Sequence, residues 1–176
     1  MNNIFRNIVL TLACLFVFFT SFAQGANTLS SLKYDKVIIY EYFSGYNRDI
    51  VDGRGRVIKD AKKQAPLNTA EMNNLSKYLD SKSSYGNVEA GCFDPHFGIV
   101  YYDKTKIAAY MTVCFGCNRL RSSIELAGQK GKMGKGKDAY YMLDGGLSKS
   151  FRHFLGTLLI KYKFSEQITP GEPFDK

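Results

Sequence analysis

Three of the chain's four cysteines lie in one stretch, Cys92 to Cys117, which also holds one of its two histidines. Within this stretch, residues 98–103 and 106–114 are rich in β-branched and aromatic side chains and are separated by a short polar turn. That pattern predicts a β-hairpin. The hairpin and the cysteines therefore form one unit, around which the rest of the fold has to be built.

The expected register of this hairpin pairs Tyr102 with Ile107. Continued along both strands, it places Val113 opposite His96 and brings the three sulfur atoms to one end of the hairpin. Pro95 has no backbone N–H, so the ladder is expected to loosen near it. We therefore predict that the cysteines lie close together, whatever the detail of the pairing.

The first 23 residues have the pattern of a cleaved secretory signal peptide. A short polar start with Arg6 precedes a long apolar run over residues 8–19, and the segment ends at Ala23 with the small residues typical of a cleavage site. A retained membrane anchor is an alternative, but the run is short for a membrane span. Lipidation at Cys14 is another, but the residues before it form a poor lipobox.

Cleavage after Ala23 would leave 153 residues with a formal charge of +7, because Arg6 is removed from a total of +8. We expect residues 24–176 to form a single domain without a stable membrane span, exported to the periplasm or secreted. Three cysteines in an oxidising compartment leave at least one thiol that is free, intermolecular or metal-bound.

The remaining patterns predict an α+β domain with a mainly antiparallel sheet. A continuous apolar run over residues 36–43 predicts a strand buried on both faces, and the central hairpin covers about residues 97–114. Two helices, from about 68 to 80 and from about 147 to 162, each carry an apolar stripe that has to pack on the sheet. The tail from about residue 165 is expected to be loose.

Residues 128–137 contain four glycines and four lysines, which is typical of a mobile surface loop. With the net positive charge, the loop suggests attraction to an acidic envelope component, and nucleic acid is an unsuitable partner for an exported chain without a reader motif. The candidate basic-surface residues are Lys130, Lys132, Lys135 and Lys137.

Three sequence blocks, CFDPH (92–96), GIVYYD (98–103) and CFGCN (114–118), resemble a family of small secreted, largely uncharacterised Bacteroidetes proteins. That family has a CFxPxHG-IVFYD block followed by a CxxCN block. The resemblance implies an exported protein and no particular activity. Members often carry a second histidine beside the glycine, where this chain has Phe97, so a histidine-dependent role carries over only weakly to His96.

For the cysteines themselves, the register favours a disulfide between Cys92 and Cys117, or between Cys92 and Cys114. The first would close a loop of about 25 residues and stabilise the fold by about 3 kcal/mol in the chain-entropy model. The alternative is a zinc site, since the two pairs Cys92 and His96, and Cys114 and Cys117, supply four suitable ligands. The expected cofactor is therefore none, or zinc in the alternative.

Catalysis by the same cluster has weaker support. A redox CxxC needs its first cysteine at a helix N-terminus, and here Cys114 ends a strand. A cysteine hydrolase needs a histidine beside the thiol, and His153 falls on the polar side of its predicted helix. We therefore expect an exported, non-catalytic domain with a structural Cys/His cluster, and keep a thiol- or zinc-dependent enzyme as the alternative.

Overall fold

The computed structural model describes residues 28–43, 45, 47–127, 129–133, 140–143, 145–166, 168 and 174. The expected signal peptide, residues 1–23, lies outside this part of the chain. None of the described helices is long and apolar enough to cross a membrane.

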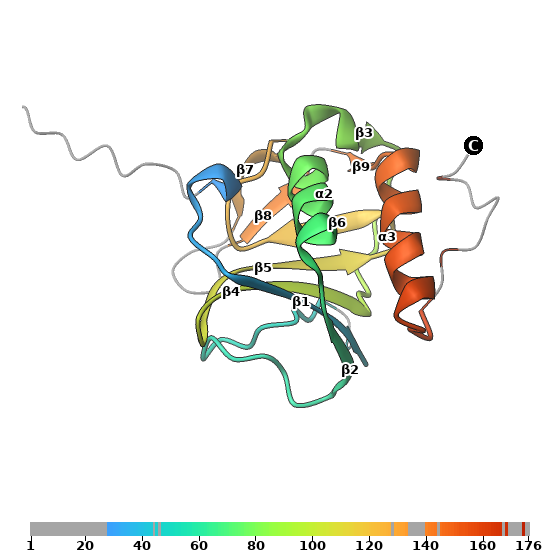
Figure 1. The fold of residues 1–176 in the computed structure, drawn as a ribbon. Coiled ribbons are helices and arrows are strands. Elements are labelled where there is room, and N and C mark those ends of the chain that lie inside the picture. Colours follow the sequence, from blue (N-terminus) through green and yellow to red (C-terminus); the bar gives the residue numbers. More distant parts are fainter. Residues whose placement is uncertain are drawn as a thin grey trace, which may run out of the picture.

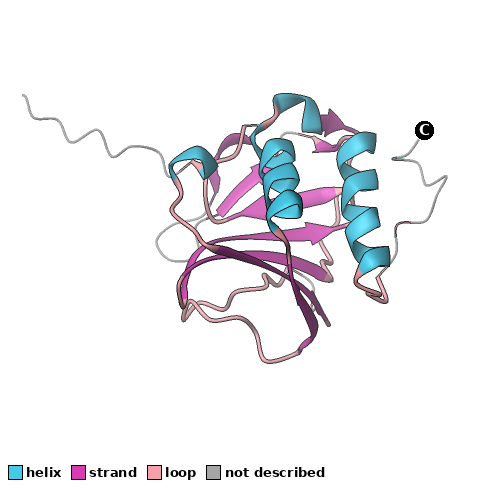
Figure 2. Cartoon of the chain, viewed as in Figure 1, coloured by secondary structure: helices cyan, strands magenta, loops and turns pink. Residues whose placement is uncertain are grey.

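A seven-stranded antiparallel sheet, in the order β2-β1-β4-β5-β6-β8-β7, forms the centre of the described fold, and β3 and β9 make a separate pair (Figure 1). Helices α2 and α3 lie side by side on one face of the sheet (Figure 2). This arrangement confirms the predicted α+β class. The strands are β1 (Lys36–Tyr42), β2 (Ala61–Pro66), β3 (Tyr85–Asn87), β4 (Phe97–Asp103), β5 (Lys106–Cys114), β6 (Arg119–Ser122), β7 (Gln129–Met133), β8 (Tyr140–Leu143) and β9 (Gly146–Leu147). The helices are α2 (Thr69–Asp80) and α3 (Lys149–Lys161), with short 3₁₀ turns η2 (Leu29–Ser31) and η3 (Lys82–Ser84).

Strand β1 is buried on both faces, as its apolar run predicts. Because alternate side chains point to opposite faces, Val37 and Ile39 join the core beneath the helices. Tyr40 and Tyr42 point the other way, into a second cluster covered by the segment that follows β1. The sheet therefore has a helix-covered face and a loop-covered face.

Helix α2 begins at a capping box. The side chain of Asn68 accepts a hydrogen bond from the backbone N–H of Glu71 at 3.0 Å, and the Glu71 carboxylate accepts one from the Asn68 N–H at 2.9 Å. These two bonds satisfy N–H groups that a helix start leaves without partners. Leu75 and Leu79 then bury one face against the sheet.

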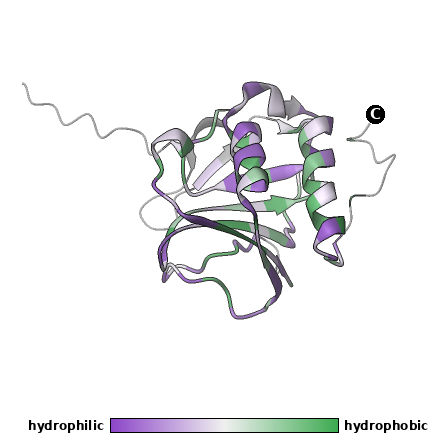
Figure 3. Ribbon diagram, viewed as in Figure 1, coloured by the Kyte–Doolittle hydropathy of each residue, from purple (hydrophilic) through white to green (hydrophobic). Residues whose placement is uncertain are grey.

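Helix α3 begins after Ser148, whose hydroxyl accepts a hydrogen bond from the N–H of Phe151 at 3.3 Å. The predicted stripe is buried, with Phe151 and Leu155 inaccessible to solvent, whereas His153 is exposed as expected. Hydrophilic and hydrophobic stretches alternate along this helix in Figure 3. The helix starts two residues later than predicted, because Leu147 belongs to β9.

The hairpin forms with one change of register. Tyr102 pairs with Ile107 as predicted. A β-bulge at the next pair then shifts the register by one residue, so that Val113 lies opposite Phe97 and not His96. The shift places two fully buried side chains together in the core, and leaves His96 half-buried outside it.

We predicted a mobile loop over residues 128–137. This prediction is wrong for the first part of the segment, because residues 129–133 form strand β7. Backbone hydrogen bonding to β8 makes the strand, and glycine and lysine do not prevent such pairing. Strand β7 ends the sheet order, and lysines are common on edge strands because they discourage further pairing. Strands β2, β3, β8 and β9 were likewise not predicted.

Gly98 in the hairpin allows a covering segment to pack closely on the loop-covered face of the sheet. Ile50, from the segment after β1, is fully buried against Gly98 of β4. A Cβ atom on residue 98 would lie 2.4 Å from Ile50 Cγ1, closer than carbon atoms can approach. The absence of a side chain at this position therefore lets the covering segment reach the sheet.

The described part of the C-terminal tail contacts the domain. The backbone N–H groups of Ser165 and Glu166 donate to one carboxylate oxygen of Glu41, at 2.7 and 2.8 Å. Phe174 is buried, and its carbonyl accepts a hydrogen bond from the side chain of Asn87 at 2.7 Å.

Candidate functional site

The structure brings the three predicted cysteines together. Cys92 and Cys117 form a disulfide, with an S–S distance of 2.08 Å and a Cα–Cα distance of 5.6 Å. Cys114 is a free, buried thiol, and the three sulfur atoms all lie within 4.8 Å of one another. The cluster packs with Phe93 beside the main core.

The chemistry available to Cys114 is limited by its surroundings. Burial raises the pKa of this thiol above its ordinary value, and nearby backbone hydrogen bonds only partly oppose the effect. A thiol in that state is a poor nucleophile, because the thiolate is the reactive form. The arrangement therefore resembles a structural cystine with a buried cysteine packed against it.

His96 lies outside the group of sulfur atoms. Its Nδ1 is 3.4 Å from the carbonyl oxygen of Tyr42, and its Nε2 is 3.7 Å from a carboxylate oxygen of Asp94. The sulfur atoms of Cys92 and Cys117 become metal ligands only when the disulfide is reduced. A four-ligand zinc site would thus need both reduction and movement of His96.

The asparagine of the CFGCN block has a structural role that its position explains. Asn118 has a positive φ of 53°, and its side-chain amide donates to the carbonyls of Val88 and Leu147 at 2.8 and 3.1 Å. Its side-chain oxygen accepts from the buried guanidinium of Arg152 at 3.2 Å. Asn118 therefore ties the β3–β9 pair and helix α3 to the cysteine turn.

Two of the four lysines predicted to form a basic surface lie in the described part of the chain, and two do not. Lys130 and Lys132 lie in strand β7, and Lys135 and Lys137 fall outside the described residues.

The disulfide loop continues directly into a site that the cysteine pattern does not reveal. Phe93, the neighbour of Cys92, lies with its ring centroid 4.0 Å from the guanidinium carbon of Arg121, and Tyr140 lies 4.5 Å from the same atom. The carbonyl of Phe93 accepts a hydrogen bond from the N–H of Asn47 at 3.0 Å. Arg121 in turn donates to the carbonyl and side-chain oxygens of Asn47, at 3.2 and 2.6 Å.

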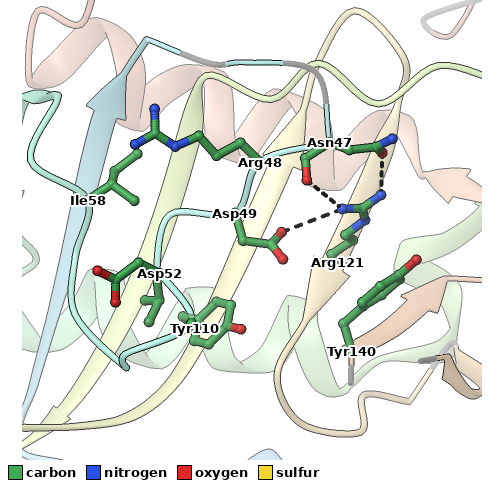
Figure 4. Close-up of a pocket in the computed structure, with 10 residues that line it drawn as sticks. Asn47, Arg48, Asp49, Asp52, Ile58, Tyr110, Arg121 and Tyr140 are labelled. Atoms are coloured by element: carbon green, nitrogen blue, oxygen red, sulfur yellow. Dashed lines mark hydrogen bonds and ion pairs between the residues drawn. The ribbon is translucent and has the colours of Figure 1, made fainter. Parts of the chain in front are cut away.

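Arg121 lines a pocket of about 440 Å³ on the loop-covered face (Figure 4). This volume lies within the range of small-molecule binding sites. In Figure 4, Asp49 and Arg121 point toward each other, with the rings of Tyr110 and Tyr140 nearby. The lining residues are Asn47, Arg48, Asp49, Val51, Asp52, Gly53, Ile58, Tyr110, Arg121 and Tyr140.

Two polar atoms in the wall of this pocket are buried without a hydrogen-bond partner among the described residues, Nε of Arg121 and Oδ1 of Asp49. The two side chains form an ion pair, but its 3.9 Å separation is too long for a hydrogen bond. Burial raises the pKa of the Asp49 carboxyl, although Arg121 and Thr112 act in the opposite direction. An unpartnered buried polar group costs about 1–3 kcal/mol.

The charged groups around the pocket balance one another. Arg48 and Asp60 form an ion pair, in which the second N–O contact is 3.0 Å long. Asp52 pairs with Arg56 at 3.2 Å. Of the lining residues, two are arginines and two are aspartates, so their formal charges cancel.

A larger hollow of about 960 Å³ runs along helix α3. Its walls are mainly apolar and include Gly156, Ile160 and the tail residue Ile168.

The sequence patterns do not single out Arg121 as a site residue. A signal was present, since Arg121 alternates with Leu120 and Ser122 in a strand and so points to the face opposite Leu120. Asn47 and Asp49 were in an unassigned segment, and only the fold brings them to Arg121.

No protein-family model, curated protein or solved structure matches this chain. A proposal for its function rests on the geometry of its own residues.

Proposed function

We propose that this protein is an exported, non-catalytic binding domain, whose pocket beside Arg121 holds a small polar group of an envelope or extracellular partner. The observation that carries the proposal is the chain of contacts from the disulfide to the pocket. Cys92 fixes the segment with Phe93, which stacks on Arg121 and holds Asn47. The cystine then has a defined task, which is to keep the pocket wall in place.

Absence of turnover is part of the proposal. The arginines and aspartates around the pocket are engaged in ion pairs with one another. General acid–base catalysis requires a group placed to exchange its proton with the substrate. The backbone and side chain of Arg56 lower the pKa of Asp52, whereas the Asp49 carboxyl, whose pKa burial raises, faces the guanidinium of Arg121, which does not give up its proton.

A thiol- or zinc-dependent enzyme is the second candidate. The observation in its favour is that three sulfur atoms lie within 4.8 Å of one another. It requires the reduced protein to gain an activity or to bind one equivalent of zinc. Zinc that is retained by reduced protein and lost on His96→Ala would support this candidate against the binding domain.

The export component predicts the mass of the mature protein. Protein recovered from the envelope or the medium should lack residues 1–23, since the apolar run and the small residues up to Ala23 form a cleavage pattern. Intact-mass spectrometry decides this directly. Recovery of a species that retains those residues would show that the segment is not a cleaved signal.

The binding component is tested by ¹H–¹⁵N NMR spectra of the oxidised protein with four classes of probe: neutral saccharides, inorganic phosphate, free amino acids and short peptides. The proposal predicts that at least one class shifts signals of Asn47, Tyr110 and the Arg121 side chain, and that the probe is recovered unchanged. Pocket signals that respond to no class, or conversion of the bound probe, would contradict a binding role.

A further inference from the structure

Resting on the proposed function, we infer that the pocket recognises a neutral saccharide unit, with one sugar hydroxyl bridging Arg121 and Asp49. A hydroxyl group both accepts and donates a hydrogen bond. It can accept from Nε of Arg121 and donate to Oδ1 of Asp49, the two buried atoms of the pocket wall that lack hydrogen-bond partners among the described residues. A carboxylate only accepts and an ammonium only donates, so neither group does both.

The guanidinium is already committed in a way that disfavours an anion. Carboxylates and phosphates are recognised by arginine through two parallel N–H groups. In Arg121 the two terminal nitrogens donate to the carbonyl and side-chain oxygens of Asn47. Each terminal nitrogen therefore has one N–H engaged, and Nε is the guanidinium nitrogen without a hydrogen-bond partner among the described residues. Its single N–H suits a single acceptor such as a hydroxyl oxygen.

The charges around the pocket also disfavour an anionic ligand. Asp49 lies 3.9 Å from the guanidinium and would repel an anion placed there. Arg48 and Asp52 are paired with Asp60 and Arg56. A ligand without net charge meets no unbalanced charge in this site, whereas the net positive charge of the chain lies elsewhere.

The aromatic groups supply the apolar part of the site. Tyr110 from β5 and Tyr140 from β8 both line the pocket. Aromatic rings bury apolar surface while keeping a polar hydroxyl at one end, which matches a sugar ring with an apolar face and a polar edge. The two unpartnered atoms are buried, so binding of a ligand to them requires a neighbouring side chain to shift. Tyr140 is placed to do so, because its half-buried ring lies 4.5 Å from the guanidinium carbon.

The sign of the effect of Asp49→Asn distinguishes the possible ligands. Methyl glycosides of glucose, galactose, mannose and N-acetylglucosamine, and their oligomers, serve as probes, with glucuronic acid, inorganic phosphate and glycine for comparison. We expect a neutral glycoside to bind, and Asp49→Asn to weaken it at least about tenfold, because a hydrogen bond to a charged acceptor is lost. Asp80→Asn removes the same charge from α2 on the other face, and should change the affinity less than about twofold.

Tyr140→Ala and Tyr141→Ala form a second pair, which serves if Asp49→Asn does not fold. Adjacent residues of β8 point to opposite faces, and only Tyr140 lines the pocket. We expect Tyr140→Ala to abolish glycoside binding and Tyr141→Ala to preserve it.

Three results would overturn the inference. Phosphate or glucuronic acid that binds more tightly to Asp49→Asn would show an anion site, and binding of glycine alone would show an amino-acid site. Either result leaves the proposed binding function in place. If none of the probe classes shifts the pocket signals, both the inference and the proposed function fail.

Discussion

Phe151→Ala is expected to lower the free energy of unfolding by about 3–5 kcal/mol, the range typical of a large aromatic side chain removed from a core. Phe151 is inaccessible to solvent, and its ring stacks on Tyr78 with centroids 5.1 Å apart. It also meets Tyr85 edge-on at 6.1 Å. The substitution leaves a cavity between α3, α2 and the sheet that these rings cannot fill.

His153→Ala on the same helix is the matched control. His153 is exposed, so its removal should change stability by less than about 0.5 kcal/mol. Urea unfolding of both variants gives the comparison. Equal and small losses would show that α3 does not pack on the sheet as described.

Loss of the disulfide has the second large effect. The double variant Cys92→Ser/Cys117→Ser should lose about 3 kcal/mol, because the unfolded chain regains the freedom of a loop with a sequence separation of 25 residues. Cys114→Ala retains the cystine and should lose about 1 kcal/mol, as for a small buried side chain. Thermal unfolding with and without reductant provides the measurement.

Non-reducing peptide mapping of the wild-type protein should find one linked pair containing Cys92 and Cys117. Three free thiols, or a melting midpoint that does not respond to reductant, would contradict the structural cystine.

Much of the fold could be predicted because its signals are local. Both helices are defined by residues three and four apart in the sequence. These residues make the capping box at Asn68, the N-cap at Ser148 and the apolar stripes. The apolar run of β1 likewise predicts a strand buried on both faces. The hairpin brings Cys92 near Cys117 even though a bulge changes its register.

The pocket could not be predicted in the same way. Arg121 comes from β6, Asp49 and Asn47 come from the segment after β1, and Tyr140 comes from β8. Their contact depends on strand order and on the close approach of Ile50 to Gly98, neither of which has a periodic signature. Strand β7 was missed for a related reason, since its pairing with β8 comes from the backbone.

The central claim is that the cystine holds Arg121 in place, and the side-chain Nε–H signal of Arg121 in ¹H–¹⁵N NMR spectra tests it most directly. In the oxidised protein we expect this signal to be resolved and protected from exchange, because the guanidinium lies between Phe93 and Tyr140 and donates to Asn47. In folded Cys92→Ser/Cys117→Ser it should broaden or exchange with solvent, while core amides of β1 remain protected. An Arg121 signal that is unchanged in the double variant would contradict the claim.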